Sequence, residues 1–235
     1  MADRELSIVV ARHGNTFEKG DSPTRVGGRT DLPLTETGRE QARRLGRAWR
    51  RQGWTPAACW CGPLRRTVET ARLALAELGL AMAPQSDERF REIDYGEDEN
   101  RPEELVRLRL GWNKLGVKGA AAEAAAAGVE ILRAWDERAE VPDGWLADPA
   151  ALSAMWRAFA EECQARFAAP ASESAAVLVV TSNGVARFAP ALLPGGLEEF
   201  RRRHPAGPKL STGAYGVFLY ARDGYWTCPA WNVPS

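Results

Sequence analysis

The sequence contains few of the side chains that bind metals. It has only two histidines, His13 and His204, and four cysteines at positions 59, 61, 163 and 228. A structural zinc site needs about four nitrogen or sulfur ligands close together, and this set does not supply them. We therefore expect no metal site and no resident cofactor. We interpret the cysteines as buried thiols of a cytoplasmic protein.

Net charge and long apolar runs are also lacking. Lys and Arg number 31, as do Asp and Glu, so the formal net charge is +0 and favours neither nucleic acid nor membrane as a partner. No segment approaches the ~18 apolar residues of a membrane span. The first apolar run, Leu6–Ala11, is short and follows charged residues, so no secretory signal is visible. We expect a cytoplasmic protein that binds a small molecule; the sequence does not indicate its oligomeric state.

Short apolar runs alternate with helical patterns along the chain. Helices are predicted from Thr35, from about Pro63 and over Pro149–Phe167. The first would be capped by Thr35, or by Thr37 in a capping box with Glu40. Strands are predicted at Leu6–Ala11, Ala57–Cys61, Val177–Thr181, Ala214–Ala221 and Tyr225–Trp231, the last two joined by a turn at Arg222-Asp223-Gly224. This order predicts an α/β fold, a three-layer α/β/α sandwich with a mostly parallel central sheet.

One region is too long for an ordinary crossover between strands. Residues 97–176 separate two predicted core strands and contain an alanine-rich tract at Ala120–Ala127. We expect a helical insertion over one end of the sheet, within a single domain of residues 1–235. Its small core would consist of Trp112, Trp135, Trp145 and Trp156.

Polar residues follow three of the predicted strands. Arg12 and His13 end the first strand, Arg65 and Arg66 begin a helix after the second, and Ser182-Asn183-Gly184 follow Val177–Thr181. Ligands of open α/β sheets bind beyond the carboxyl ends of the strands, and helix N-termini attract anions. Arginines, a histidine and free backbone N–H groups at one edge suit a phosphate.

Four segments resemble those of a known family. Ala11–Phe17 (ARHGNTF) resembles the RHG signature of the histidine phosphatase (phosphoglycerate mutase-like) superfamily. Asp31–Gly38, Pro63–Ala71 and Phe90–Gly96 are similar, in order, to the segment after the RHG loop, the second-arginine helix and the acidic loop. The resemblance is close over about the first 100 residues and loose over about the last 60. It implies metal-independent phosphoryl transfer.

The resemblance implies a role for each matching residue. His13 would attack phosphorus and carry the phosphoryl group. Arg12 and Arg66 would hold the phosphoryl oxygens, with Arg65 as the alternative to Arg66. Glu92 would protonate the leaving oxygen and then activate water.

The chain departs from the family where a second histidine is usual. Counting from Gly184, that position is Ser182, and we expect Ser182 and Asn183 to contact phosphate and the activity to be low. Asn15 and Thr16 either touch substrate or cap their loop. The other histidine, His204, is expected in a solvated basic loop.

These residues predict a phosphomonoesterase that acts on a small phosphorylated metabolite through a phosphohistidine. Two alternatives stay open at this point: a phosphoglycerate mutase-type transferase, and a catalytically silent module that binds a phosphorylated ligand.

Overall fold

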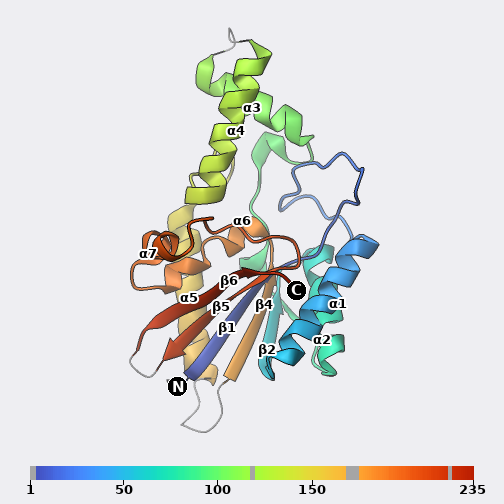
Figure 1. The fold of residues 1–235 in the computed structure, drawn as a ribbon, viewed down its shortest axis with the longest axis vertical. Helices are drawn as coiled ribbons and strands as arrows, with labels where there is room; N and C mark the ends of the chain where they lie inside the picture. Colours follow the sequence, from blue (N-terminus) through green and yellow to red (C-terminus); the bar gives the residue numbers. More distant parts are fainter. Residues whose placement is uncertain (1–3, 117–119, 168–174, 222–223) are drawn as a thin grey trace.

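A six-stranded sheet forms the centre of the molecule. The computed structural model describes residues 4–116, 120–167, 175–221 and 224–235. The strands are β1 (Arg4–Arg12), β2 (Pro56–Cys61), β3 (Gln85–Ser86), β4 (Ala175–Thr181), β5 (Tyr215–Ala221) and β6 (Trp226–Val233). Their order is β3-β2-β4-β1-β5-β6 (Figure 1). The β3-β2, β2-β4 and β4-β1 pairs are parallel, whereas β1-β5 and β5-β6 are antiparallel. The expected α/β fold with a mostly parallel sheet is confirmed; the predicted turn at 222–223 lies outside the described residues.

Helices cover both faces of this sheet. α1 (Glu36–Arg51) and α2 (Arg65–Leu78) lie on one face, and α5 (Pro149–Phe167) lies on the other (Figure 1). α1 is capped by Thr35, whose side chain accepts from the Gly38 N–H. The alternative cap is wrong, because the Thr37 hydroxyl donates to Glu18 instead.

The central strands are buried on both sides because their side chains alternate between two apolar clusters. In β1, Val9 and Ala11 belong to the cluster that includes Leu45 and Trp49 of α1. Ile8 and its alternate neighbours belong to the cluster that includes Phe159 of α5. The strand ends, and the loops that follow them, are thereby held in fixed positions.

A helical hairpin stands beyond the carboxyl edge of the sheet. It consists of α3 (Glu103–Leu115) and α4 (Ala121–Arg138) and projects at the top of Figure 1. The two helices meet at glycines: a Cβ on Gly111 would lie 1.8 Å from the Ala124 carbonyl oxygen, and one on Gly128 would lie 1.9 Å from that of Arg107. No larger residue fits at either position without separating the helices.

The expected insertion is therefore shorter than residues 97–176. α5 belongs to that range, yet it lies along a face of the sheet and not beyond its end (Figure 1). Its Trp156 and Phe159 belong to the apolar cluster that includes residues of β1. The tryptophans do not form a separate core either, since Trp135, Trp145 and Trp156 share one cluster with β1 residues. The helical period of α5 predicts an apolar face but does not indicate which surface that face covers.

The remaining elements are short. They are α6 (Asn183–Ala186), α7 (Gly196–Arg203) and three 3₁₀ turns at Glu88–Phe90, Gly96–Asp98 and Ala189–Leu192. All four cysteines are buried and unpaired, as expected. Among the described residues, no helix combines the length and apolar character that crossing a membrane requires.

Candidate active site

His13 stands at the carboxyl end of β1 with a defined tautomer. Its Nδ1 lies 2.7 Å from the Gly14 carbonyl oxygen, which can only accept, so Nδ1 carries the proton. Nε2 lies 3.2 Å from Nε of Arg66, which can only donate, so Nε2 holds a lone pair. Burial, reinforced by the charges of Arg66 and Arg12, holds the pKa of His13 well below its usual value. The ring is thus neutral at neutral pH.

Arg66 reaches His13 from the first turn of α2. Its side chain is fully buried, and its Nη1 and Nη2 donate to the carbonyl oxygens of Thr30, at 2.7 Å, and Gly27, at 3.1 Å. Arg65 is exposed, and its backbone N–H donates to Asp31. The structure therefore brings Arg66, and not Arg65, to the histidine.

Arg12 is held by the segment that precedes β5. Its Nη1 donates to the Leu210 carbonyl oxygen at 2.8 Å, while its buried Nε has no hydrogen-bond partner among the described residues. Burial lowers the pKa of Arg12. The Leu210 N–H donates in turn to Oδ1 of Asn183 at 3.0 Å, so the backbone of one residue orients two side chains of the site.

Glu92 is buried, and its carboxylate is held by three donors. Oε1 accepts from the Ile93 N–H at 2.9 Å, and Oε2 accepts from the Gly184 N–H at 3.1 Å and from the Tyr95 hydroxyl at 3.4 Å. Burial and the charge of Glu92 raise the pKa of Tyr95, so the phenol keeps the proton that it donates. A Cβ on Gly184 would lie 2.2 Å from Oε1, which leaves the carboxylate no room to shift toward that residue.

Arg12, His13 and Glu92 border one cavity of about 930 Å³, while Arg66 lies behind His13 and contacts its Nε2. Asn15, Thr16 and Asn183 line it together with Arg12, His13 and Glu92. The Oδ1 bond to Leu210 leaves Nδ2 of Asn183 without a protein partner in the described part of the chain. The opposite wall is the α3–α4 hairpin, which contributes Glu103, Arg107, Val129, Leu132, Arg133, Trp135, Asp136 and Glu137.

Ser182 does not line this cavity. It is fully buried, and its Oγ has no hydrogen-bond partner among the described residues. The contact of Ser182 with phosphate therefore stays a prediction, and the residue of this turn that lines the cavity is Asn183. The turn into α6 directs Asn183, one residue later, to the cavity instead.

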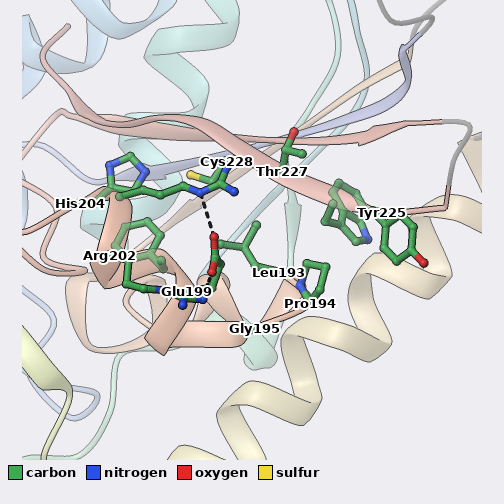
Figure 2. Close-up of a pocket in the computed structure, with 12 residues that line it drawn as sticks. Leu193, Pro194, Gly195, Glu199, Arg202, His204, Tyr225, Thr227 and Cys228 are labelled. Carbon is green, nitrogen blue, oxygen red and sulfur yellow. Dashed lines mark hydrogen bonds and ion pairs between the residues drawn. The ribbon is translucent and has the colours of Figure 1, made fainter.

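His204 lies outside the cavity of His13. Its ring stacks on Phe200 at 4.4 Å between centroids, and its Nε2 is buried. It lines a separate cavity of about 400 Å³ with Glu199 and Cys228, between α7 and β6 (Figure 2). The expectation of a solvated histidine is wrong, because the ring packs on a buried phenylalanine of its own helix.

Sequence reasoning missed three residues that shape the site. Tyr95 supports Glu92, Arg187 lines the cavity, and Thr70 accepts the Gly14 N–H at 3.1 Å. Arg187 follows β4 by a few residues, so the sequence alone could have placed it at the same sheet edge. Within the described residues, no three His, Cys, Asp or Glu side chains group in a way that could hold a metal ion.

Comparison with solved structures shows the same fold over the whole chain. A mycobacterial glucosyl-3-phosphoglycerate phosphatase is similar with a TM-score of 0.72 and 20% identity, covering 97% of this chain and 99% of that one. A phosphoglycerate mutase from Bacillus anthracis is similar with a TM-score of 0.69 and 20% identity, covering 98% and 94% of the two chains.

Sequence comparison finds curated relatives over part of the chain. The probable phosphoglycerate mutase GpmB of Yersinia pestis is 36% identical over 115 residues, which are 48% of this chain. The match spans about half the length of that relative, 51%. The family model of the histidine phosphatase superfamily (branch 1) matches residues 8–234. The chain therefore belongs to the histidine phosphatase superfamily.

Proposed function

We propose that this chain is a metal-independent phosphomonoesterase that hydrolyses a small phosphorylated metabolite through a phosphohistidine at His13. The observation that carries the proposal is the state of the ring: Nδ1–H is bonded to Gly14, and Nε2 holds its lone pair beside Arg66. A buried neutral imidazole with a fixed tautomer is an activated nucleophile.

In the first step, the Nε2 lone pair of His13 forms a bond to phosphorus while the bond from phosphorus to the leaving oxygen breaks. Protonated Glu92 gives its proton to that oxygen, and an alcohol departs. The guanidinium groups of Arg12 and Arg66 offset the charge on the phosphoryl oxygens. We assign Nδ2 of Asn183, which lines the cavity one residue after the position of the family's second histidine, as a further donor.

In the second step, a water molecule attacks phosphorus and the bond to Nε2 breaks. The Glu92 carboxylate takes the proton of the water, so inorganic phosphate leaves and both His13 and Glu92 return to their starting states. The fixed donors around Glu92 suit this double role, because they hold it in one orientation through both steps.

Two other functions of the same site remain to be separated from this one. The names of the curated relatives favour a mutase, and Ser182 in the position of the second histidine favours a silent binding module. Phosphate release without a bisphosphate primer supports the phosphatase. Isomerisation of a phosphoglycerate that depends on such a primer, without phosphate release, supports the mutase. Phosphate binding without turnover supports the module.

The test is a phosphate-release screen over many phosphometabolites, run beside His13→Ala. Alkaline quenching of the reaction with a labelled substrate should trap a phosphoenzyme that is acid-labile and alkali-stable. The His13→Ala protein should give neither turnover nor label. Full labelling of that variant would refute the assignment of His13.

A further inference from the structure

Arg187 is a buried cation that the proposed mechanism does not use. It ends α6 and is 1% exposed, yet it borders the cavity of His13. Its Nε donates to the Asn183 carbonyl oxygen at 3.2 Å, its Nη1 donates to the carbonyl oxygen of Trp135, and its Nη2 lies 3.5 Å from Oδ1 of Asp136. Each of its three nitrogens therefore contacts a protein acceptor, and these contacts connect it to other elements of the site.

These contacts join the hairpin to the sheet edge. Trp135 and Asp136 lie in the last turn of α4, and the Trp135 carbonyl oxygen accepts both from the C-cap N–H of Ala139, at 3.1 Å, and from Arg187. A cation at this end is favoured by the helix dipole. The guanidinium also lies over the Trp135 ring, 3.8 Å from its centroid, a cation–π geometry that offsets part of the cost of burying the charge.

The other end of this link is the turn that contacts Glu92. Asn183, whose carbonyl oxygen Arg187 holds, precedes Gly184, whose N–H donates to Oε2 of Glu92. Gly184 also packs closely there, since an added Cβ would lie 2.8 Å from Cγ1 of Ile93. A shift of the α6 turn would therefore move the Glu92 carboxylate.

We propose that Arg187 is a positioning residue, which fixes the α6 turn against the end of α4 and thereby fixes the orientation of Glu92. The effect of Arg187 on catalysis rests on the proposed function. Its effect on the position of the α6 turn does not. An arginine is required because two nitrogens of its planar guanidinium reach the carbonyl oxygens of Asn183 and Trp135 at the same time. A lysine ammonium carries all its donors on one nitrogen.

The test is Arg187→Lys, which keeps the charge and removes the fork. The matched control is Arg109→Lys. Arg109 ties α3 to Asp98, with Nε 2.6 Å from Oδ1, and within the described residues its hydrogen bonds and ion pairs go to Asp98, Asp143 and Glu97 and not to α6. Both variants are assayed on an alkyl phosphate, which needs a proton on its leaving oxygen, and on an activated aryl phosphate, which does not. Amide exchange of Gly184 is measured by NMR in parallel.

In Arg187→Lys we expect kcat for the alkyl phosphate to fall by roughly tenfold or more and kcat for the aryl phosphate to change less than about threefold. The Gly184 amide should exchange at least about tenfold faster, because its bond to Glu92 opens more often. Arg109→Lys should alter neither the kcat ratio nor the Gly184 exchange.

Equal slowing of both esters, or unchanged Gly184 protection, would overturn the role of Arg187. A wild-type protein that hydrolyses neither ester would refute the proposed function, and the exchange measurement would still decide this inference. If Arg187→Lys does not fold, Asp136→Asn loosens the same anchor and should accelerate Gly184 exchange in the same direction; unchanged exchange there would refute the link.

Discussion

The depressed pKa of His13 predicts a measurable dependence of stability on pH. In the unfolded chain the ring titrates near pH 6.5, whereas in the folded protein it stays neutral to a much lower pH. Between these two values the unfolded state binds more protons than the folded state, so the free energy of unfolding falls as the pH falls. The full contribution of His13 to the free energy of unfolding is present above the pKa of the ring in the unfolded chain.

The magnitude follows from the linkage relation. If the folded ring remains neutral at pH 5.5, protonation of the unfolded chain lowers the free energy of unfolding by about 1.4 kcal/mol between pH 7.5 and pH 5.5. The assay is urea unfolding at both pH values for wild type and His13→Asn. All other ionisable groups are common to the two proteins, so the difference between the two pH dependences isolates His13.

We expect the wild type to lose about 1.4 kcal/mol more than His13→Asn over this interval. Identical losses would show that the folded ring is protonated as readily as the unfolded one. Nε2 would then not be the free lone pair that nucleophilic attack requires, and the reasoning behind the proposed function would be wrong. The measurement needs no substrate.

Four further predictions concern the neighbours of His13. Glu92→Gln should slow alkyl phosphates by about 10²–10⁴-fold and activated aryl phosphates far less; equal slowing in steady-state assays would indicate a structural role. Gly184→Ala should reproduce the same selectivity, because its Cβ would lie 2.2 Å from the Glu92 carboxylate, and a crystal structure should show that carboxylate displaced. Activity should survive exhaustive treatment with EDTA; loss that Mg²⁺ or Zn²⁺ restores would contradict the mechanism. Ser182→His should lower the free energy of unfolding by about 1–3 kcal/mol through overpacking, since Ser182 is fully buried. It should not accelerate turnover, because Ser182 does not line the cavity. A higher kcat/KM in that variant would show that the new ring reaches the phosphate.

The sequence predicted the sheet edge well because parallel strands direct their carboxyl ends to one side. Arg12 and His13 follow β1, and Asn183 follows its parallel neighbour β4, so the register alone places these residues together. The same reasoning does not distinguish Ser182 from Asn183, because strand order does not determine which side chain of a turn faces the cavity and which faces the core.

Contacts between distant segments were beyond the sequence. Neither the bond from Arg12 to Leu210 nor the bond from Arg187 to Trp135 leaves a local pattern, since each joins residues far apart in the chain. The position of α5 was missed for a related reason: its length and apolar face suit an insertion and a sheet layer equally.

The glycine contact inside the hairpin has a consequence for redesign of the protein. Because α3 and α4 meet where backbone approaches backbone, at Gly111 and Gly128, their pairing does not rest on the side chains that line the cavity. The exposed ones among those positions, Val129 and Arg133, can be varied in a library while the two glycines keep the helices at the same distance. The hairpin thus offers a surface on which substrate preference can be selected without rebuilding the sheet edge that holds His13.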